Sequence, residues 1–241
     1  MVTTQCLLCE GTTFTDYGAG LVKCSSCHLV VAAGIPKDAN LAKLYQEDYF
    51  FGQEYFDYEA DRPALEVNFR RHIARLSGLF TPTSRVVEVG CAYGYFLNLI
   101  KDRVAWHKGY DVSEDGITFA REGLGVNARN ADFLTEPMAA GSVDTVVMWD
   151  VIEHVPRPRE FLSRAAEVLK PGGSLVLTTG DISARIARWR GSKWRPIHPP
   201  THIHYFDPRT LTDMIARYGL RETSVTHQGA SRNAGSGLNP C

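Results

Sequence analysis

From residue 84 onward, short apolar runs alternate with segments whose apolar residues recur every three or four positions. The apolar runs are nearly continuous, as in VDTVVMW and SLVLTT, which is typical of strands buried on both faces of a parallel sheet. The pattern predicts strands at 85–90, 107–112, 127–131, 143–149 and 174–179, with helices at 93–103, 114–123 and 158–169 between them. This alternation indicates an α/β fold with a doubly wound, mostly parallel sheet and helices on both faces.

Further elements flank the predicted sheet. Lys170 and the Pro-Gly-Gly after it are expected to end the helix at 158–169. A later helix at 207–219 begins with Asp207 as N-cap and Pro208 at its first position, and a last strand is expected at 220–227. Before the sheet, four apolar residues at helical spacing predict a helix: Leu65, Phe69, Ile73 and Leu76.

Four cysteines form two CxxC pairs, CLLC at 6–9 and CSSC at 24–27. This spacing predicts a tetrahedral zinc site made by Cys6, Cys9, Cys24 and Cys27. Four sulfur ligands leave no open position, so the zinc is expected to be structural. A disulfide framework would belong to an oxidising compartment, and a redox CxxC would explain one pair only. The metal is expected to supply the folding free energy of so short a segment.

The sequence is therefore divided into four parts. Residues 1–33 are interpreted as a zinc ribbon, and 34–83 as an aromatic-rich helical bridge or lid with an aromatic cluster at 45–58. Residues 84–229 form the predicted α/β core. The small and polar residues 230–241 are expected to be a disordered tail.

Composition and net charge exclude some classes of partner. The 241 residues are 44% hydrophobic and 22% charged, with a formal net charge of −1, so no global positive field would hold nucleic acid or an anionic membrane. No run of 18 apolar residues and no basic-then-apolar N-terminus occurs, so neither a transmembrane span nor a signal peptide is expected. A cytoplasmic location is the default expectation.

Positive charge is concentrated between Ile182 and Phe206, where no acid occurs and two tryptophans are interleaved. The segment is either a solvated helix face or a contact for an anionic substrate. Its basic residues are Arg185, Arg188, Arg190, Lys193 and Arg195.

The stretch VVEVGCAYGYFL, residues 86–97, places a glycine-containing turn after the first predicted strand. Ala92 replaces the middle glycine of a dinucleotide-binding turn, and no GK[ST] follows, so the stretch is neither a pyrophosphate fingerprint nor a P-loop. Glu88, near the end of the strand, would repel a phosphate and attract a cation.

Two more acids follow the next two predicted strands. Asp111 can accept hydrogen bonds from ribose hydroxyls, and Asp132, beside Phe133, can accept one from the exocyclic amine of a base. The predicted ligand has a ribose, a base with an amine, and a positive amino group instead of phosphates. S-adenosylmethionine fits this description. A helix N-cap is the alternative role for each acid.

Five segments, in order, resemble the class I S-adenosylmethionine-dependent methyltransferases. They are VVEVGCAYGYF, GYDVS, ADF, VDTVVMWDVIEHVPRP and LKPGGSLVLTT, and the resemblance covers about residues 84–228. It implies a Rossmann-like methyltransferase fold. The cofactor-binding residues that it implies surround the methionine, ribose, adenine and sulfonium: Glu88, Gly90, Cys91, Ala92, Gly94, Tyr95, Phe96, Asp111, Val112, Asp132, Phe133, Trp149 and Asp150.

The ribbon-first order is similar to bacterial small-molecule methyltransferases. The zinc-bearing sugar C-methyltransferases of antibiotic biosynthesis share this order, but they are longer, with an extra C-terminal domain that this chain lacks. The family usually ends with a seventh, antiparallel strand. Nothing after residue 228 predicts one, so either an earlier segment fills that position or the sheet edge is open.

Three histidines are candidates for the chemistry. Methyl transfer displaces an activated sulfonium, so alignment is the main task, and a base is needed only if the acceptor must lose a proton. His154 follows the fourth predicted strand, and His202 and His204 lie in the loop RPIHPPTHIHYF. Each could be a base or a substrate contact, with packing or helix capping as the alternative. As a metal pair, His202 and His204 lack an obvious third ligand.

The function predicted from these features is S-adenosylmethionine-dependent methyl transfer to an oxygen or carbon of a small, anionic, biosynthetic molecule. The alternative is a zinc-ribbon methyltransferase of ribosomal RNA bases. Against it, the ribbon has Lys23 against Glu10 and Asp16, and the fourth-strand motif lacks an Asn/Asp-Pro-Pro-aromatic signature. A third class is a non-catalytic scaffold that binds the cofactor. A nucleic-acid partner is not expected, and the oligomeric state is left open.

Overall fold

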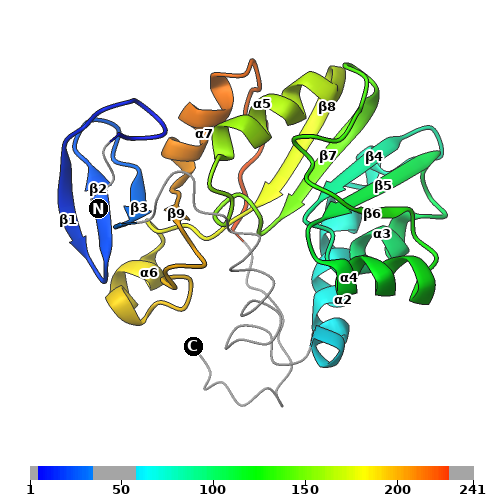
Figure 1. Cartoon of the computed structure of the whole chain (residues 1–241), viewed down its shortest axis with the longest axis horizontal. Helices are drawn as coiled ribbons and strands as arrows, with labels where there is room; N and C mark the ends of the chain where they lie inside the picture. The colour runs from blue at the N-terminus through cyan, green and yellow to red at the C-terminus, as the bar shows by residue number, and fades with distance from the viewer. Residues whose placement is uncertain (1–4, 35–57, 228–241) are drawn as a thin grey trace. The chain divides into compact units, whose positions relative to one another are not determined.

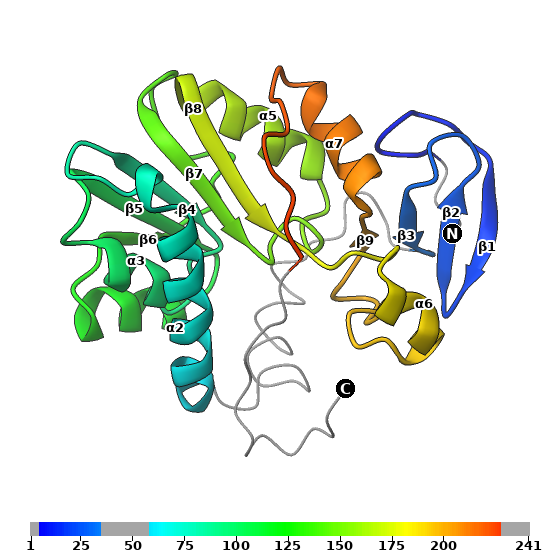
Figure 2. The ribbon, with the colours of Figure 1, turned by 180° about the vertical axis from the view of Figure 1, so that it is seen from behind.

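A computed structural model describes residues 5–34 and 58–227, seen from opposite sides in Figure 1 and Figure 2. The predicted aromatic cluster, apart from the backbone of Tyr58, and the predicted tail at 230–241 lie outside the described residues. The described chain falls into two compact units. We call residues 5–34, 150–166 and 177–225 the ribbon unit, and residues 58–149, 167–176 and 226–227 the sheet unit. The four-part division of the sequence uses other boundaries and stays a prediction.

The sheet unit is built on five strands that lie in the order β6-β5-β4-β7-β8. They are β4 (Arg85–Val89), β5 (Trp106–Asp111), β6 (Ala128–Asn130), β7 (Val143–Trp149) and β8 (Leu169–Thr178). β4 pairs in parallel with both β5 and β7, and β5 pairs in parallel with β6. The predicted doubly wound α/β fold is confirmed, and the strand order reverses at β4, where such sheets bind ligands.

The junction between helix and strand near Lys170 differs from the prediction. Helix α5 (Pro158–Val168) ends before Lys170, and β8 begins at Leu169 rather than at 174. The amides of Gly141 and Ser142 donate to the carbonyls of Glu167 and Val168 at 2.9 Å, where a continuing helix would need those acceptors. The helix therefore ends at Val168, one residue before the predicted end at 169.

The predicted last strand at 220–227 is wrong. These residues form no strand, and every residue from 221 to 227 is exposed. The segment has too few apolar side chains to bury a face, since Leu220 and Val225 are its only aliphatic residues. Within the described part of the chain, β8 is the edge of the sheet.

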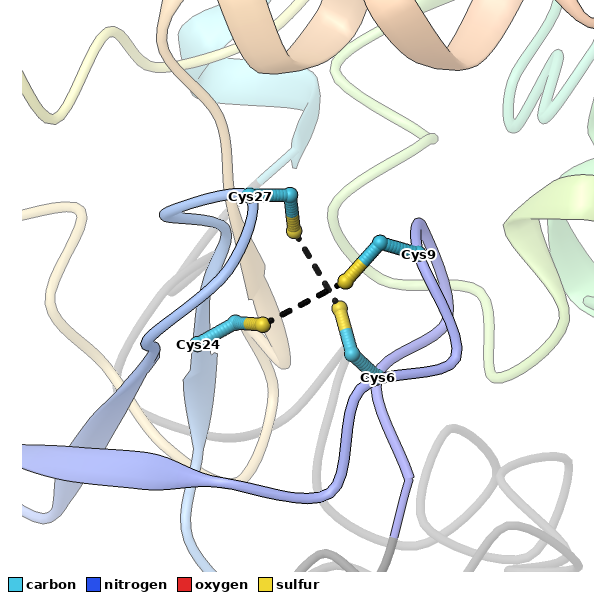
Figure 3. Close-up of side chains that lie close together, drawn as sticks. All are labelled: Cys6, Cys9, Cys24 and Cys27. Carbon is cyan, nitrogen blue, oxygen red and sulfur yellow. Dashed lines mark hydrogen bonds between the residues drawn. The ribbon is translucent and has the colours of Figure 1, made fainter.

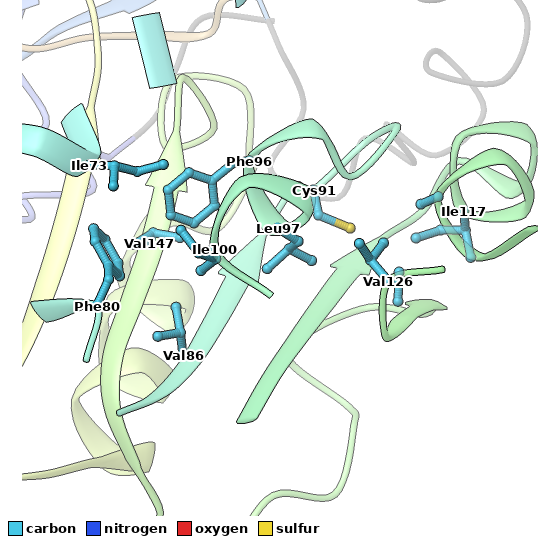
Figure 4. Close-up of a cluster of buried hydrophobic side chains, with 12 residues drawn as sticks. Ile73, Phe80, Val86, Cys91, Phe96, Leu97, Ile100, Ile117, Val126 and Val147 are labelled. Atoms are coloured by element: carbon cyan, nitrogen blue, oxygen red, sulfur yellow. The ribbon is translucent and has the colours of Figure 1, made fainter. Parts of the chain in front are cut away.

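Helices α2 (Tyr58–Arg75) and α3 (Tyr95–Ile100) pack together over the central strands. The helix predicted from Leu65 to Leu76 is thus confirmed as part of α2. A short helix, α4 (Glu114–Thr118), continues into a π-helical turn, Phe119–Gly123. Figure 4 shows the buried cluster that these elements share, which includes Ile73, Phe80, Val86, Cys91, Phe96, Leu97, Ile100, Ile117, Val126 and Val147.

The ribbon unit contains an antiparallel sheet in the order β1-β2-β3-β9. Its strands are β1 (Phe14–Gly18), β2 (Leu21–Cys24), β3 (Val30–Ala32) and β9 (His204–Tyr205). β9 joins residues far along the chain to the ribbon, and Leu21, Val30, Ala32, Ile182 and Tyr205 form a common core.

The ribbon unit also contains α6 (Arg185–Arg190), α7 (Pro208–Ala216) and α5 up to Ala166. The predicted N-cap of α7 is confirmed, since the Asp207 side chain accepts from the Thr210 amide at 2.7 Å and a full capping box forms. Over 5–34 and 58–227, no helix combines the length and hydrophobicity that a membrane span would need.

Close packing around Gly109 of β5 supports the turn after β4. A Cβ atom at Gly109 would lie 2.5 Å from the Cys91 sulfur and 2.7 Å from Leu97 Cδ1. We expect Gly109→Ala to lower the free energy of unfolding by about 1–3 kcal/mol, measured by denaturant titration, because the core must shift to admit a methyl group. Gly123→Ala is the control, since its Cβ would meet nothing closer than Phe119 at 3.5 Å. Equal stability losses in the two variants would contradict this account.

Candidate functional site

The turn after β4 has a left-handed backbone at three positions. The φ angles are 71° at Gly90, 44° at Ala92 and 73° at Gly94, the last of which caps α3. The amides of Gly90 and Cys91 both donate to the Tyr110 carbonyl, at 2.8 and 3.2 Å. Alanine adopts such a φ at a cost of about 1–2 kcal/mol, so other contacts must hold Ala92 in this conformation.

Asp111 supplies those contacts from the end of β5. Its Oδ2 accepts from the Ala92 amide at 2.7 Å, and its Oδ1 accepts from the Ser113 amide at 2.9 Å. Burial raises the pKa of Asp111, while its backbone hydrogen bonds lower it. A carboxylate offers about four acceptor positions, so two remain beyond the bonds that fix the turn. The sequence predicted the acid but not its hold on Ala92.

Glu88 is enclosed at the end of β4. It is 2% exposed, and its Oε2 has no hydrogen-bond partner among the described residues. Burial raises the pKa of Glu88 well above its ordinary value, and the negative charge of Asp111 raises it further. A buried carboxyl with an unsatisfied oxygen is an acceptor for a donor that the free chain lacks, and a cationic group would match it best.

Several predicted cofactor residues bury their side chains in the core. Cys91 and Phe96 belong to the cluster in Figure 4, Tyr95 is 2% exposed, and Phe133 is buried with its ring 6.0 Å from that of Tyr110. Val112, by contrast, is 43% exposed. The role of these residues at a cofactor stays a prediction, and for the buried ones the backbone is the part nearest the turn.

The carboxylates of the two remaining acids, Asp132 and Asp150, each accept a hydrogen bond within the chain. Asp132 Oδ1 accepts from the Leu134 amide at 2.9 Å. Asp150, with a φ of 52°, accepts from the Thr178 hydroxyl at 2.8 Å. The contact of Asp132 is of the kind that an acid makes at the start of a turn. It is similar to a helix N-cap, which is the alternative role expected for Asp132.

Trp149 ends β7 in the sheet unit. Its ring stacks on His72 of α2 at 4.7 Å and lies 5.1 Å from Phe96. Asp150 is its neighbour in sequence but belongs to the ribbon unit. The position of His72 in the helical pattern of the sequence carries no sign that its ring faces Trp149.

The three candidate histidines all belong to the ribbon unit, and two of them meet. The rings of His154 and His202 are 4.4 Å apart and nearly perpendicular. The Nε2 atom of His204 lies 3.0 Å from the Val155 carbonyl instead. Burial lowers the pKa of His154 and of His204 to about 4. A group with so low a pKa is a weak proton acceptor at neutral pH, which leaves His202, only partly buried, as the better base candidate.

The four paired cysteines converge in the ribbon, as Figure 3 shows. The sulfur atoms of Cys6 and Cys27 are 3.4 Å apart, and those of Cys9 and Cys24 are 3.5 Å apart. With Zn–S bonds of about 2.3 Å, tetrahedral sulfur ligands lie about 3.8 Å apart, so the set fits one zinc ion and is too open for disulfides.

The two cysteine loops repeat the same backbone hydrogen bonds. The Glu10 amide donates to the Cys6 carbonyl, and the His28 amide donates to the Cys24 carbonyl. Burial raises the pKa of the Cys6 and Cys27 thiols, so a cation would be needed to keep them as thiolates at neutral pH. The two loops thus fit a metal ion.

The basic segment is partly exposed. Arg185, Arg188 and Lys193 are exposed, and Trp189 is 78% exposed. Arg188 is held by the Ser183 carbonyl at 2.9 Å, and the Arg190 guanidinium lies 5.7 Å from the Trp189 ring centroid. Both the solvated helix face and the anion contact remain compatible with this arrangement.

Residues 58–225 match the family model described as a methyltransferase domain. The chain belongs to this family. Among solved structures, S-adenosylmethionine-dependent methyltransferases from Archaeoglobus fulgidus and Thermotoga maritima superpose with TM-scores of 0.56 and 0.55 at 24% and 23% identity. They cover 75% and 67% of this chain and 75% and 73% of their own, and at such identities the likeness shows the fold alone.

Curated relatives carry methyltransferase names. The chain is 31% identical over 190 residues to a Mycolicibacterium smegmatis protein named "Probable S-adenosylmethionine-dependent methyltransferase", covering 78% of this chain and 66% of that protein. It is 26% identical over 160 residues to the ubiquinone biosynthesis O-methyltransferase of Idiomarina loihiensis, covering 61% and 65%. The match spans just under two thirds of either relative. The methyltransferase family predicted from five motifs is confirmed.

Metal binding by the four-cysteine cluster can be tested separately from cofactor binding. We expect Co²⁺ substituted for the ribbon metal to give an intense thiolate-to-metal absorption band, because four sulfur atoms surround the ion. Cys9→Ser should remove most of this band and weaken metal binding. Cys91→Ala is the matched control, since Cys91 is buried in the sheet unit and should leave the band intact. A band that survives Cys9→Ser would exclude the four-cysteine site.

Proposed function

We propose that this methyltransferase transfers the methyl group of S-adenosylmethionine to an oxygen of a small anionic molecule. The observation that carries the proposal is the pair of acids at the switch point of the sheet, buried Glu88 with an unsatisfied oxygen and half-buried Asp111 with free acceptor positions. When bound, the cofactor supplies a methyl group on an activated sulfonium, and the chain aligns the acceptor with it.

Asp111 is proposed to bind the ribose hydroxyls. Its two backbone hydrogen bonds are already made in the free chain, so the carboxylate needs no reorganisation to accept two more. The same bonds keep Ala92 in its left-handed conformation, which brings the backbone of the turn close to the ligand side of β4. One side chain thereby shapes the turn and presents acceptors to the ligand.

Glu88 is proposed to receive the amino group of the methionine part. In the free chain the carboxyl favours its protonated form, because burial and the charge of Asp111 both penalise ionisation. A bound ammonium group would reverse this preference and satisfy Oε2. A phosphate-bearing dinucleotide would offer Glu88 no cation and would be repelled by any charge on Asp111, which supports a sulfonium nucleoside with an amino acid part.

The methyl acceptor is proposed to be an oxygen. Several curated relatives are named as ubiquinone biosynthesis O-methyltransferases, at 26–30% identity. The exposed basic residues of α6 and the turn after it support an anionic acceptor. The zinc of the ribbon is proposed to be structural, since four sulfur ligands leave no open position.

The alternative of ribosomal RNA methylation has less support. Within the ribbon, Glu10 lies 3.3 Å from Arg159 in an ion pair, and Asp16 Oδ1 accepts from the Gly18 amide, so the ribbon does not offer a uniformly basic face. Among the described residues of the ribbon, no group of basic side chains supplies the positive charge that binding to RNA would need.

Replacing Glu88 by glutamine should separate stability from binding. The folded pKa of Glu88 is raised, so its protonated form stabilises the free protein below the ordinary glutamate pKa, and this contribution is lost as pH rises through the raised value. Glu88→Gln cannot ionise. We therefore expect its melting temperature to rise relative to wild type as pH increases, with no difference in acid. Glu122→Gln, an exposed position, should show no such trend.

The same variant should weaken cofactor binding selectively. We expect Glu88→Gln to bind S-adenosylmethionine roughly 10- to 100-fold more weakly by calorimetry, because a charge-assisted hydrogen bond contributes about 1.5–3 kcal/mol. 5′-Methylthioadenosine lacks the amino acid part, so its affinity should not change. Asp111→Asn should weaken both ligands. If wild type binds neither ligand at micromolar concentration, the proposed cofactor is wrong; if Glu88→Gln weakens both equally, only the role of Glu88 fails.

A further inference from the structure

Two segments of the ribbon unit bring three metal-binding side chains together. Glu153 and His154 follow β7 in the chain, and His202 precedes β9. The amides of Ile203 and His204 both donate to the Glu153 carbonyl, at 2.9 and 3.1 Å, which fixes the two segments against each other. The sequence offered no third ligand for His202 and His204. The structure instead groups His202 with His154 and Glu153, and His204 is not part of the group.

The donor atoms are close enough to share one ion. A carboxylate oxygen of Glu153 and one ring nitrogen from each of His154 and His202 lie within 4.8 Å of one another. Ligands of one tetrahedral ion with bonds of about 2.1 Å lie about 3.4 Å apart, so side-chain movements of up to about 1.4 Å would complete the site. The rings of His154 and His202, with centroids 4.4 Å apart and nearly perpendicular, are already close enough for such movements to bring both to one ion.

The hydrogen bonding of His154 prepares one nitrogen for a metal. Its Nδ1 lies 3.0 Å from the Thr201 carbonyl, which can only accept, so Nδ1 carries the proton. The lone pair is then on Nε2. A histidine that binds a metal through one nitrogen and donates from the other to a backbone carbonyl is the usual arrangement in metal sites.

The buried carboxylate of Glu153 favours a cation at this position, because a buried charge is stabilised by an opposite one. Glu153 is 3% exposed and His154 is 7% exposed. Two imidazoles and one carboxylate suit Zn²⁺ and neighbouring transition metals better than Mg²⁺ or Ca²⁺, which prefer oxygen ligands. Three protein ligands also leave a coordination position open, in contrast to the closed four-cysteine set.

We propose that Glu153, His154 and His202 form a second metal site, selective for a divalent transition metal such as Zn²⁺, with an open position for an oxygen ligand. On the proposed function, that ligand is the acceptor hydroxyl, whose pKa the ion would lower. The metal site itself does not depend on that function, since it rests on ribbon-unit residues alone.

The test is a titration of the zinc-loaded full chain with Co²⁺. The wild type should bind one further equivalent, giving weak visible d–d bands without the thiolate band of the ribbon site. Glu153→Gln and His202→Asn should each weaken this binding at least about 10-fold. His198→Asn is the matched control, since it lies in the same loop outside the donor set and should bind as wild type does.

Two results would overturn the proposal. One is a wild type without saturable Co²⁺ binding beyond the ribbon, a result that needs no variant to be folded. The other is unchanged affinity in both variants, with circular dichroism spectra that match wild type confirming that they are folded. Calorimetry with S-adenosylmethionine tests the proposed function separately, so the failure of either proposal can be recognised without the other.

Discussion

The pair of hydrogen bonds accepted by the Asp111 carboxylate is the constraint on which the site of this methyltransferase depends. They join the turn after β4 to the turn after β5, at 2.7 and 2.9 Å, and so fix the two strand ends at which the sheet reverses its order. The left-handed φ of Ala92 is tolerated because this carboxylate holds its amide. Close packing of the Cys91 side chain against Gly109 of β5 also supports this turn.

A second constraint is that two acids lie close together at the ends of β4 and β5. The charge of Asp111 raises the cost of ionising buried Glu88, and the Oε2 atom of Glu88 has no hydrogen-bond partner among the described residues. Such an arrangement lowers the stability of the free protein, and a cationic ligand would recover that loss on binding. The affinity for a positive amino group and the instability of the free site would thus have one physical origin.

The ribbon is more closely tied to the rest of the chain than its sequence indicated. β3 pairs with β9, so residues near 30 and near 204 share one sheet and one core. The same loop that provides β9 brings His202 beside His154 and Glu153. A metal in the cysteine cluster would therefore stabilise the sheet from which this loop projects.

The sequence by itself determined the α/β fold, the cysteine cluster, the N-cap at Asp207 and the acids Glu88 and Asp111. These features depend on spacing along the chain, on hydrophobic period and on residue types with few alternative roles. Tertiary structure alone decided the other features. They are the hydrogen bond from the Ala92 amide to Asp111, the early end of α5, the exposed segment at 220–227, and the proximity of Glu153 to His202. Those outcomes depend on hydrogen bonds and burial between residues distant in the chain, which local pattern cannot encode because the partner is chosen by the fold.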